Sequence, residues 1–196
     1  MSNGDDVPSA AGCERCAALV DARSQVVDGT GRPDADLAFV GEAPGQSEDE
    51  QGEPFVGRSG DVLDDALADA GLTRDAVWIT NCVRCRPPDN RDPTSAELSN
   101  CRGHLDRELA AVDPELVVAL GKVPAEHLLD REVAVTAAAG ATETVEIGGT
   151  AREVLVCVHP AATLYDPAQR ETFAATVRDA VDRADVAGDQ RQLGDF

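Results

Sequence analysis

The sequence predicts an α/β fold, a three-layer α/β/α sandwich around a central, mainly parallel four-stranded sheet. Four short apolar runs, bounded by polar or glycine-rich segments, have the length and composition of buried strands. Segments with helical periodicity alternate with these runs along the chain. Strands that alternate with helices form parallel sheets that helices cover on both faces, which is why three layers are expected.

The expected strands are 37–40, 77–79, 116–120 and 154–158. Helices are expected over 61–70, from a capping box at Thr94 and Glu97 onward, over 123–129 and over 168–184. Residues 42–59 and 84–93 are rich in glycine or proline and are expected to be loops. Residues 131–152 are ambiguous, with small strands favoured around Gly148 and Gly149.

The charge of the chain is strongly negative. There are 37 acidic and 17 basic side chains, a formal net charge of −20, yet 42% of the residues are hydrophobic. This is too apolar for a disordered acidic chain. A large negative charge destabilises a compact chain because its acidic groups repel one another. Molar salt shortens the screening length to about 3 Å and so weakens this repulsion, which is why we expect a halophilic protein. Taken alone, the charge argues against nucleic acid as a partner.

The length fits one domain over residues 1–184, with a frayed stretch at 1–12 and an acidic, polar tail at 185–196. No apolar run approaches the roughly 20 residues that span a membrane, and the first residues carry no signal-peptide core. A cytoplasmic location is therefore expected. Six cysteines in a cytoplasmic chain favour metal binding or chemistry over disulfides.

The cysteines form two CxxC pairs, Cys13 with Cys16 and Cys82 with Cys85, and Cys101 follows on a predicted helix. Two such pairs typically indicate a zinc site, but thiolates suit iron–sulfur clusters equally well. The residue types alone do not decide between zinc and an iron–sulfur cluster. They also do not decide which of the later cysteines are ligands. In open parallel sheets, ligands bind beyond the carboxyl ends of the strands. That rule indicates residues 41–45, 81–86, 121 and 159–164.

Three motifs in these stretches resemble those of one known family. They are Gly-Glu-Ala-Pro-Gly at 41–45 with Gly-Glu-Pro-Phe-Val-Gly-Arg-Ser-Gly at 52–60, Thr80-Asn81 leading into Cys-Arg-Pro-Pro-Asp-Asn-Arg at 85–91, and His-Pro-Ala at 159–161. In order and spacing the chain resembles the family 4 uracil-DNA glycosylases of iron–sulfur type, from Cys13 to about Arg170. With the charge, the resemblance indicates a halophilic archaeon as the source.

The resemblance implies a uracil-DNA glycosylase fold and the hydrolysis of the N-glycosidic bond of deoxyuridine in DNA, which releases uracil and leaves an abasic site for base excision repair. It implies a monofunctional enzyme with a [4Fe–4S] cluster on Cys13, Cys16, Cys85 and Cys101, and leaves Cys82 as a free thiol. The alternatives are a non-catalytic iron–sulfur DNA-binding module of the same fold and a glycosylase that accepts a broader range of deaminated bases.

The resemblance also assigns residues to the site. The uracil-binding residues are expected to be Gly41, Ala43, Glu48, Phe55, Asn81 and His159, and the catalytic ones Glu42 and His159. Phe55 would stack on uracil, and the amide of Asn81 has the donor and the acceptor that O4 and N3–H require. His159 would donate to O2 as the glycosidic bond breaks.

Two acidic residues complete the expected site. Relatives with a clear aspartate base carry it where this chain has Ala43, so Glu42 is the candidate that orients water. Glu48 would border C5 of the base and exclude the methyl group of thymine.

DNA contacts are expected from Arg86, Arg91 and Leu164. Five arginines, Arg84 among them, stand against four acids between residues 81 and 107, the least negative stretch of the chain. Uracil-containing DNA is the expected partner of a monomeric protein. Ala161 stands where the family commonly has serine, and Tyr165 is an alternative to Leu164 for filling the space of the flipped nucleotide.

Overall fold

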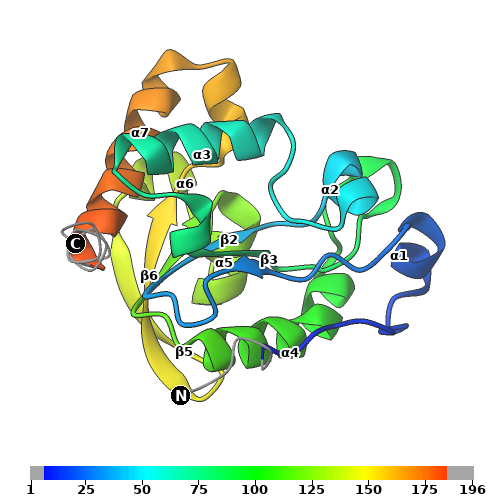
Figure 1. Cartoon of the computed structure of the whole chain (residues 1–196). Coiled ribbons are helices and arrows are strands. Elements are labelled where there is room, and N and C mark those ends of the chain that lie inside the picture. The colour runs from blue at the N-terminus through cyan, green and yellow to red at the C-terminus, as the bar shows by residue number, and fades with distance from the viewer. Residues whose placement is uncertain (1–6, 185–196) are drawn as a thin grey trace, which may run out of the picture.

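The computed structural model describes residues 7–184, which form one six-stranded sheet with helices on both sides (Figure 1). The strands are β1 (Thr30–Gly31), β2 (Leu37–Gly41), β3 (Trp78–Asn81), β4 (Leu116–Leu120), β5 (Thr142–Ile147) and β6 (Thr150–Cys157). Their order across the sheet is β1-β3-β2-β4-β6-β5. The four strands expected from the sequence are the central four, and they are parallel to one another.

The prediction of a four-stranded sheet is wrong at both edges, because the sheet is mixed and has six strands. Strand β1 pairs antiparallel with β3, and β5 pairs antiparallel with β6. Strand β1 spans two residues and gives no apolar run. Strand β5 forms a hairpin with β6 through Gly148 and Gly149, whose φ angles of 62° and 86° suit a two-residue turn.

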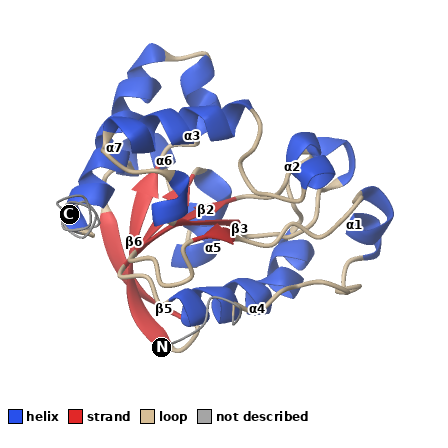
Figure 2. Ribbon diagram, viewed as in Figure 1, coloured by secondary structure: helices blue, strands red, loops and turns tan. Residues whose placement is uncertain are grey.

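In the described part of the chain, seven α-helices lie around the sheet (Figure 2). They are α1 (Ala17–Ala22), α2 (Gln46–Gln51), α3 (Arg58–Asp69), α4 (Ser95–Val112), α5 (Lys122–Leu129), α6 (Val135–Ala138) and α7 (Pro167–Arg183). The capping box of α4 is confirmed, since the amide of Thr94 donates to Glu97 at 2.7 Å and that of Glu97 donates to the Thr94 hydroxyl at 3.2 Å. Helix α2 lies inside the stretch that was expected to be a loop, and its wholly polar sequence explains the error.

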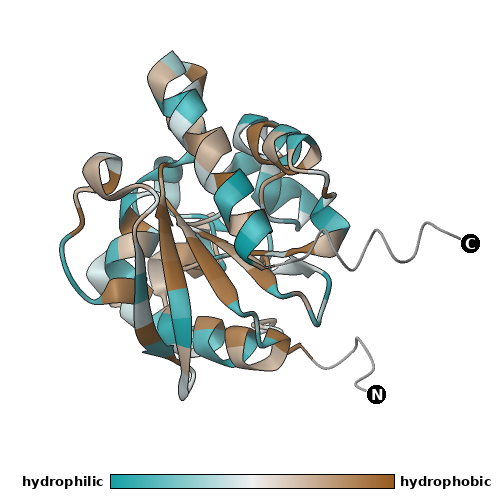
Figure 3. Ribbon diagram, turned by 90° about the vertical axis from the view of Figure 1, so that its left-hand side faces the viewer, coloured by the Kyte–Doolittle hydropathy of each residue, from teal (hydrophilic) through white to brown (hydrophobic). Residues whose placement is uncertain are grey.

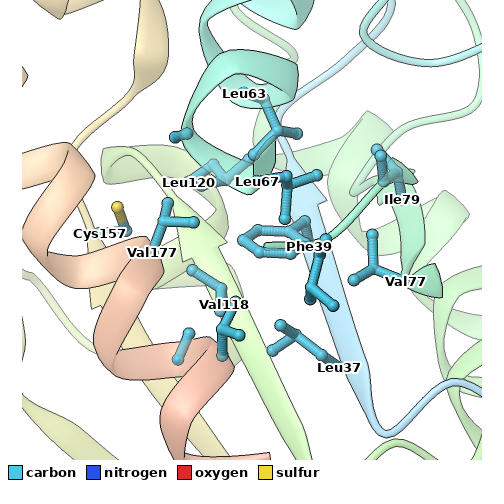
Figure 4. Packing of buried hydrophobic residues seen from close by; sticks show 14 of the residues in the cluster. Leu37, Phe39, Leu63, Leu67, Val77, Ile79, Val118, Leu120, Cys157 and Val177 are labelled. Atoms are coloured by element: carbon cyan, nitrogen blue, oxygen red, sulfur yellow. The ribbon is translucent and has the colours of Figure 1, made fainter. Parts of the chain in front are cut away.

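The core has two parts, one on each face of the sheet. Alternate residues of β2 point to opposite faces, so that Phe39 packs beneath α3 and α7 while Val40 packs against α4 and α5. Figure 4 shows the first of these clusters, with Phe39 among Leu67, Val118 and Val177. In Figure 3 the central strands are hydrophobic along most of their length, whereas the helices are mixed. The three-layer arrangement follows from this two-sided burial.

The N-terminal arm corrects a second expectation. Within the stretch expected to be frayed, Ala10 is buried and its amide donates to Asp28 at 2.8 Å, while the hydroxyl of Ser9 donates to the same carboxylate. Residues 1–6 and the expected tail at 185–196 lie outside the described residues. Across residues 7–184, no helix combines the length and the apolar character that a membrane span requires.

Candidate active site

Three of the expected site residues stand at the carboxyl ends of central strands. Gly41 ends β2 and Asn81 ends β3, and these two residues are partners in the register of the sheet. His159 follows the end of β6 by two residues. Because parallel strands bring their carboxyl ends to one edge of a sheet, loops carrying these residues meet there.

A cavity of about 200 Å³ opens at this edge. Its lining consists of Ala43, Gly45, Glu48, Phe55, Ser59, Asn81 and His159. The structure thus brings together every residue expected to bind uracil except Gly41, which lies beneath two of them. Ser59 was not assigned to the site from the sequence. Ser59 is the second residue of α3, which begins at residue 58, whereas the sequence predicts a helix that begins at residue 61. A correct prediction of the helix start was therefore the one sequence signal that could have placed Ser59 at the cavity.

Gly41 is needed for the close approach of two cavity residues. A Cβ atom at this position would lie 2.5 Å from Cζ of Phe55 and would also overlap Oδ1 of Asn81. Carbon atoms pack at about 3.5–4.0 Å, so any side chain at residue 41 would displace the phenyl ring or the amide. The absence of a side chain at Gly41 therefore permits the close approach of these two groups.

Phe55 presents one of the few aromatic rings of the chain to the cavity. It is 5% exposed, and its ring centroid lies 6.3 Å from that of His159 with 34° between the ring planes. Two tilted rings at this separation leave room for a planar ligand to lie on the phenyl face while it contacts the imidazole edge.

Asn81 is buried, and the side chain of Arg84 holds its backbone in place. The guanidinium of Arg84 donates to the Asn81 carbonyl and to the Thr80 hydroxyl, and it forms an ion pair with Glu108. Glu108 also accepts from Nε1 of Trp78 at 2.7 Å. This network fixes the end of β3 and leaves the Asn81 side chain to face the cavity.

The position of Arg84 corrects its inclusion among the arginines that face DNA. Its side chain is fully buried, and burial lowers the pKa of its guanidinium below the ordinary value. No local sequence pattern indicates this burial, because the partner of Arg84, Glu108, lies 24 residues away on α4.

His159 has a defined donor. Its Nδ1 accepts a hydrogen bond of 3.1 Å from the amide of Ala161, so the neutral ring carries its proton on Nε2. Burial lowers the pKa of His159 below the usual value for histidine. A neutral imidazole with a free Nε2–H is suited to hydrogen bonding with negative charge that develops on a leaving group.

The two acidic site residues occupy different environments. Glu48 lines the cavity, and its Oε2 accepts from the amide of Gly45, the residue that precedes α2, at 3.1 Å. Glu42 is half-buried and is not among the lining residues. Burial, and then the neighbouring carboxylate of Asp92, raise the pKa of Glu42 to about 7. A carboxyl group with such a pKa exchanges protons near neutrality.

A second, smaller hollow lies between α1 and the start of α4. Four cysteines line it, Cys13, Cys16, Cys85 and Cys101. All six cysteines of the chain are free, and Cys82 and Cys157 are buried elsewhere, so the two CxxC pairs do not form one site. Within residues 7–184, no three Cys, His, Asp or Glu side chains converge on a point that suits a single metal ion.

The sulfur atoms of this hollow receive hydrogen bonds. Nη1 of Arg23 donates to Sγ of Cys85 at 2.9 Å, and the side-chain amide of Asn100 donates to Sγ of Cys16 at 3.4 Å. Burial raises the pKa of the Cys85 and Cys101 thiols above the ordinary value. Four thiols line one largely apolar hollow, and hydrogen-bond donors are directed at two of the sulfur atoms, which is the ligand chemistry that an iron–sulfur group requires.

Arg86 is half-buried and Arg91 is exposed, and the two have partners of different kinds. Arg86 donates from Nε to Oδ1 of Asn90 at 2.7 Å. Because the Asn90 amide is neutral, this contact does not balance the positive charge of Arg86. Arg91 forms a two-pronged ion pair with Glu97, at 2.7 and 2.8 Å, and this contact lowers the pKa of Glu97 to about 2. Of these two arginines, Arg86 is the one whose contact partner is neutral.

The segment after His159 places Leu164 and Tyr165 differently. Leu164 ends the 3₁₀ helix η3 (Pro160–Leu164) and is half-buried. Tyr165 is 80% exposed and is the one large hydrophobic side chain among residues 7–184 that stands fully in solvent. The sequence favoured Leu164 for the contact with DNA, whereas exposure favours its neighbour.

The family model and most of the curated relatives belong to one group, the uracil-DNA glycosylases. The family model described as "Uracil DNA glycosylase superfamily" matches residues 29–181. The chain is 42% identical over 165 residues to a type-4 uracil-DNA glycosylase of Archaeoglobus fulgidus, covering 82% of each chain. It is 38% identical over 164 residues to a type-4 uracil-DNA glycosylase of Sulfurisphaera tokodaii, covering 81% of this chain and 74% of the relative. A type-5 uracil-DNA glycosylase of Pyrobaculum aerophilum is 38% identical over 114 residues, 57% of this chain and 49% of the relative.

Proposed function

We propose that this chain, which belongs to the type-4 uracil-DNA glycosylases within the uracil-DNA glycosylase superfamily, releases uracil from DNA by hydrolysis of the N-glycosidic bond. It is a monofunctional DNA glycosylase of base excision repair. The observation that carries this function is the cavity that unites Phe55, Asn81 and His159 at the carboxyl edge of the sheet. A base must leave the helix to enter a pocket of this kind.

The cavity side chains divide the recognition of uracil among them. The flipped base stacks on Phe55, and the Asn81 amide pairs with O4 and N3–H. Cytosine presents the reverse pattern and leaves that amide unsatisfied. Glu48, held by the Gly45 amide, borders C5 of the base and leaves no room for the methyl group of thymine.

Bond cleavage uses the remaining two groups. As the bond between C1′ and N1 breaks, its electron pair passes to uracil, and Nε2–H of His159 stabilises the charge at O2. Water adds to C1′ and gives its proton to Glu42, and solvent returns a proton to the released uracil. The raised pKa of Glu42, about 7, suits a group that accepts a proton near neutrality and supports this role. A Glu42→Gln variant that turns over at the parent rate would rule it out.

Cys13, Cys16, Cys85 and Cys101 are proposed to hold a [4Fe–4S] cluster, supported by their common hollow and by the donors to their sulfur atoms. The cluster would act structurally, joining the N-terminal arm to the loop that carries Arg86. Protein purified without oxygen should be brown and contain iron, and Cys85→Ala should lose the colour while Cys82→Ala keeps it. Colourless, iron-free protein would reject the cluster.

The DNA surface is proposed to include Arg86, Arg91 and Leu164, with Tyr165 as the exposed member of its segment. We further propose a monomer with one domain over residues 1–184, a cytoplasmic location and a halophilic source. The charge of −20 supports the halophilic source, and six cysteines without a disulfide fit the cytoplasmic location.

Release of uracil from a defined oligonucleotide, measured over a salt series, tests the function. The parent protein should release uracil, and Asn81→Ala should bind the oligonucleotide but release far less. Failure of the folded parent protein to release uracil at every salt concentration would overturn the assignment and leave a DNA-binding module.

A further inference from the structure

The backbone of Phe55 has an unusual conformation. Its φ is 54°, in the left-handed region. Four other non-glycine residues within 7–184 share a positive φ, and all are Asp or Asn: Asp89, Asn90, Asp113 and Asp130. Short polar side chains adopt this region readily, whereas a bulky one is strained there. Such strain persists only where the surrounding structure enforces it.

Arg74 contacts the backbone on both sides of Phe55. It opens the 3₁₀ helix η1 (Arg74–Ala76), shortly before β3. Its Nη2 donates to the Pro54 carbonyl at 2.7 Å, and its Nη1 donates to the Phe55 carbonyl at 3.0 Å. These two oxygens belong to the two peptide planes that flank the Phe55 Cα. A planar guanidinium that binds both therefore restrains φ and ψ of this one residue.

The guanidinium is itself held in place. Nη1 lies 3.2 Å from both carboxylate oxygens of Asp64 on α3, and Nη2 lies 3.3 Å from Oε1 of Glu53. Gly60 also lies against the same carbonyl, since a Cβ atom at this residue would overlap the Phe55 oxygen. That oxygen is thus confined by Gly60 and Arg74, and the phenyl ring is directed toward Gly41 and the cavity.

We infer that Arg74 is a positioning residue for uracil recognition, which acts on the base only through the backbone of Phe55. Arg74 does not line the cavity, so it has no direct route to the ligand. Its removal would let the loop relax from the left-handed conformation and turn the ring away. This inference rests on the proposed stacking of uracil on Phe55.

The test compares single and double variants. Arg74→Ala, Arg74→Lys, Phe55→Ala and the double variant Arg74→Ala/Phe55→Ala are assayed for KM, for kcat and for inhibition by free uracil. Hydrogen exchange of the amides of residues 53–60 measures how often this loop opens in the absence of ligand. Arg152→Ala is the matched control, because Arg152 is buried and also binds a carbonyl, that of Pro114, and a carboxylate, but lies outside the cavity lining.

Arg74→Ala should raise KM and the inhibition constant of uracil by about 10-fold to 100-fold, the range expected for lost hydrogen bonds from a charged donor, with a smaller change in kcat. Arg74→Lys should retain part of the affinity, since one ammonium cannot bind both carbonyls in a fixed plane. Exchange at residues 53–60 should quicken in both variants. In the Phe55→Ala background, Arg74→Ala should add less than about 2-fold.

Losses that multiply in the double variant would overturn the inference, as would an equal loss of uracil affinity in Arg152→Ala. Unchanged exchange at residues 53–60 in Arg74→Lys would also overturn it, and this measurement remains decisive if Arg74→Ala does not fold. One further result tests the underlying premise that uracil stacks on Phe55. If Phe55→Ala binds free uracil as well as the parent protein, the stacking role itself fails, whatever Arg74 does.

Discussion

Replacement of Gly41 by alanine should disable the cavity without unfolding the protein. The added Cβ would lie 2.5 Å from Cζ and 2.6 Å from Cε2 of Phe55, whereas such carbon pairs normally pack at about 3.5–4.0 Å. The backbone cannot yield, because Gly41 is paired with Asn81 in the sheet and its carbonyl accepts from the Cys82 amide at 2.8 Å. The displacement of about 1 Å must therefore come from the phenyl ring and the amide.

The size of the effect follows from this overlap. Overpacking of a tightly filled site costs about 1–3 kcal/mol, and a shift of the two groups that bind uracil should lower kcat/KM by about 10-fold to 100-fold. Inhibition by free uracil should weaken by a similar factor. The melting temperature should fall by about 2–12 °C, because the cost is confined to one contact.

Gly103→Ala provides the matched control for the same substitution. Gly103 lies within α4, and a Cβ there would meet only the end of the Arg107 side chain, at 3.6 Å. Alanine should favour this helix by up to about 1 kcal/mol and leave uracil release unchanged. The reasoning would be refuted by a Gly41→Ala enzyme with the parent kcat/KM, or by equal losses in the two variants.

The remaining predictions concern pH, stability and salt. Turnover should fall as the pH drops through about 7, because the raised pKa leaves Glu42 protonated below that value; Asp92→Asn should move this limb to lower pH, and a pH–rate profile without such a shift would contradict it. Glu108→Ala should lower the free energy of unfolding by about 3–5 kcal/mol in denaturant titrations, because it leaves Arg84 buried without its carboxylate. Arg86→Ala should weaken DNA binding and make the slope of log K against log salt less negative by about 1, whereas an unchanged slope would exclude a phosphate contact.

The parts of the fold that the sequence predicted are those whose signal is local. Each central strand contains a short continuous apolar run, since helices cover both faces of the sheet, and the capping box at Thr94 marks the start of α4. The missed elements lack such a signal: β1 has two residues, and α2 is polar throughout. Their formation depends on neighbours that lie far away in the chain.

The site shows the same division between local and distant causes. Asn81 and His159 could be predicted because each follows a buried strand, and the rule on strand ends then brings them to one edge. The left-handed backbone of Phe55 could not be predicted, since it depends on Arg74, 19 residues farther along the chain. The burial of Arg84 likewise depends on Glu108, which no local pattern connects to it.

These distant pairs change the meaning of the charge near the cavity. Counted along the sequence, residues 81–107 carry one more arginine than acid, but Arg84 is neutralised within the fold by Glu108, just beyond that stretch. Ion pairs also engage Arg91 with Glu97 and Arg102 with Asp106. The basic surface left for phosphates is therefore smaller than the sequence count suggests. Binding of DNA by a chain of charge −20 must then depend largely on the uncharged contacts of the cavity, which salt does not screen as it screens phosphate contacts.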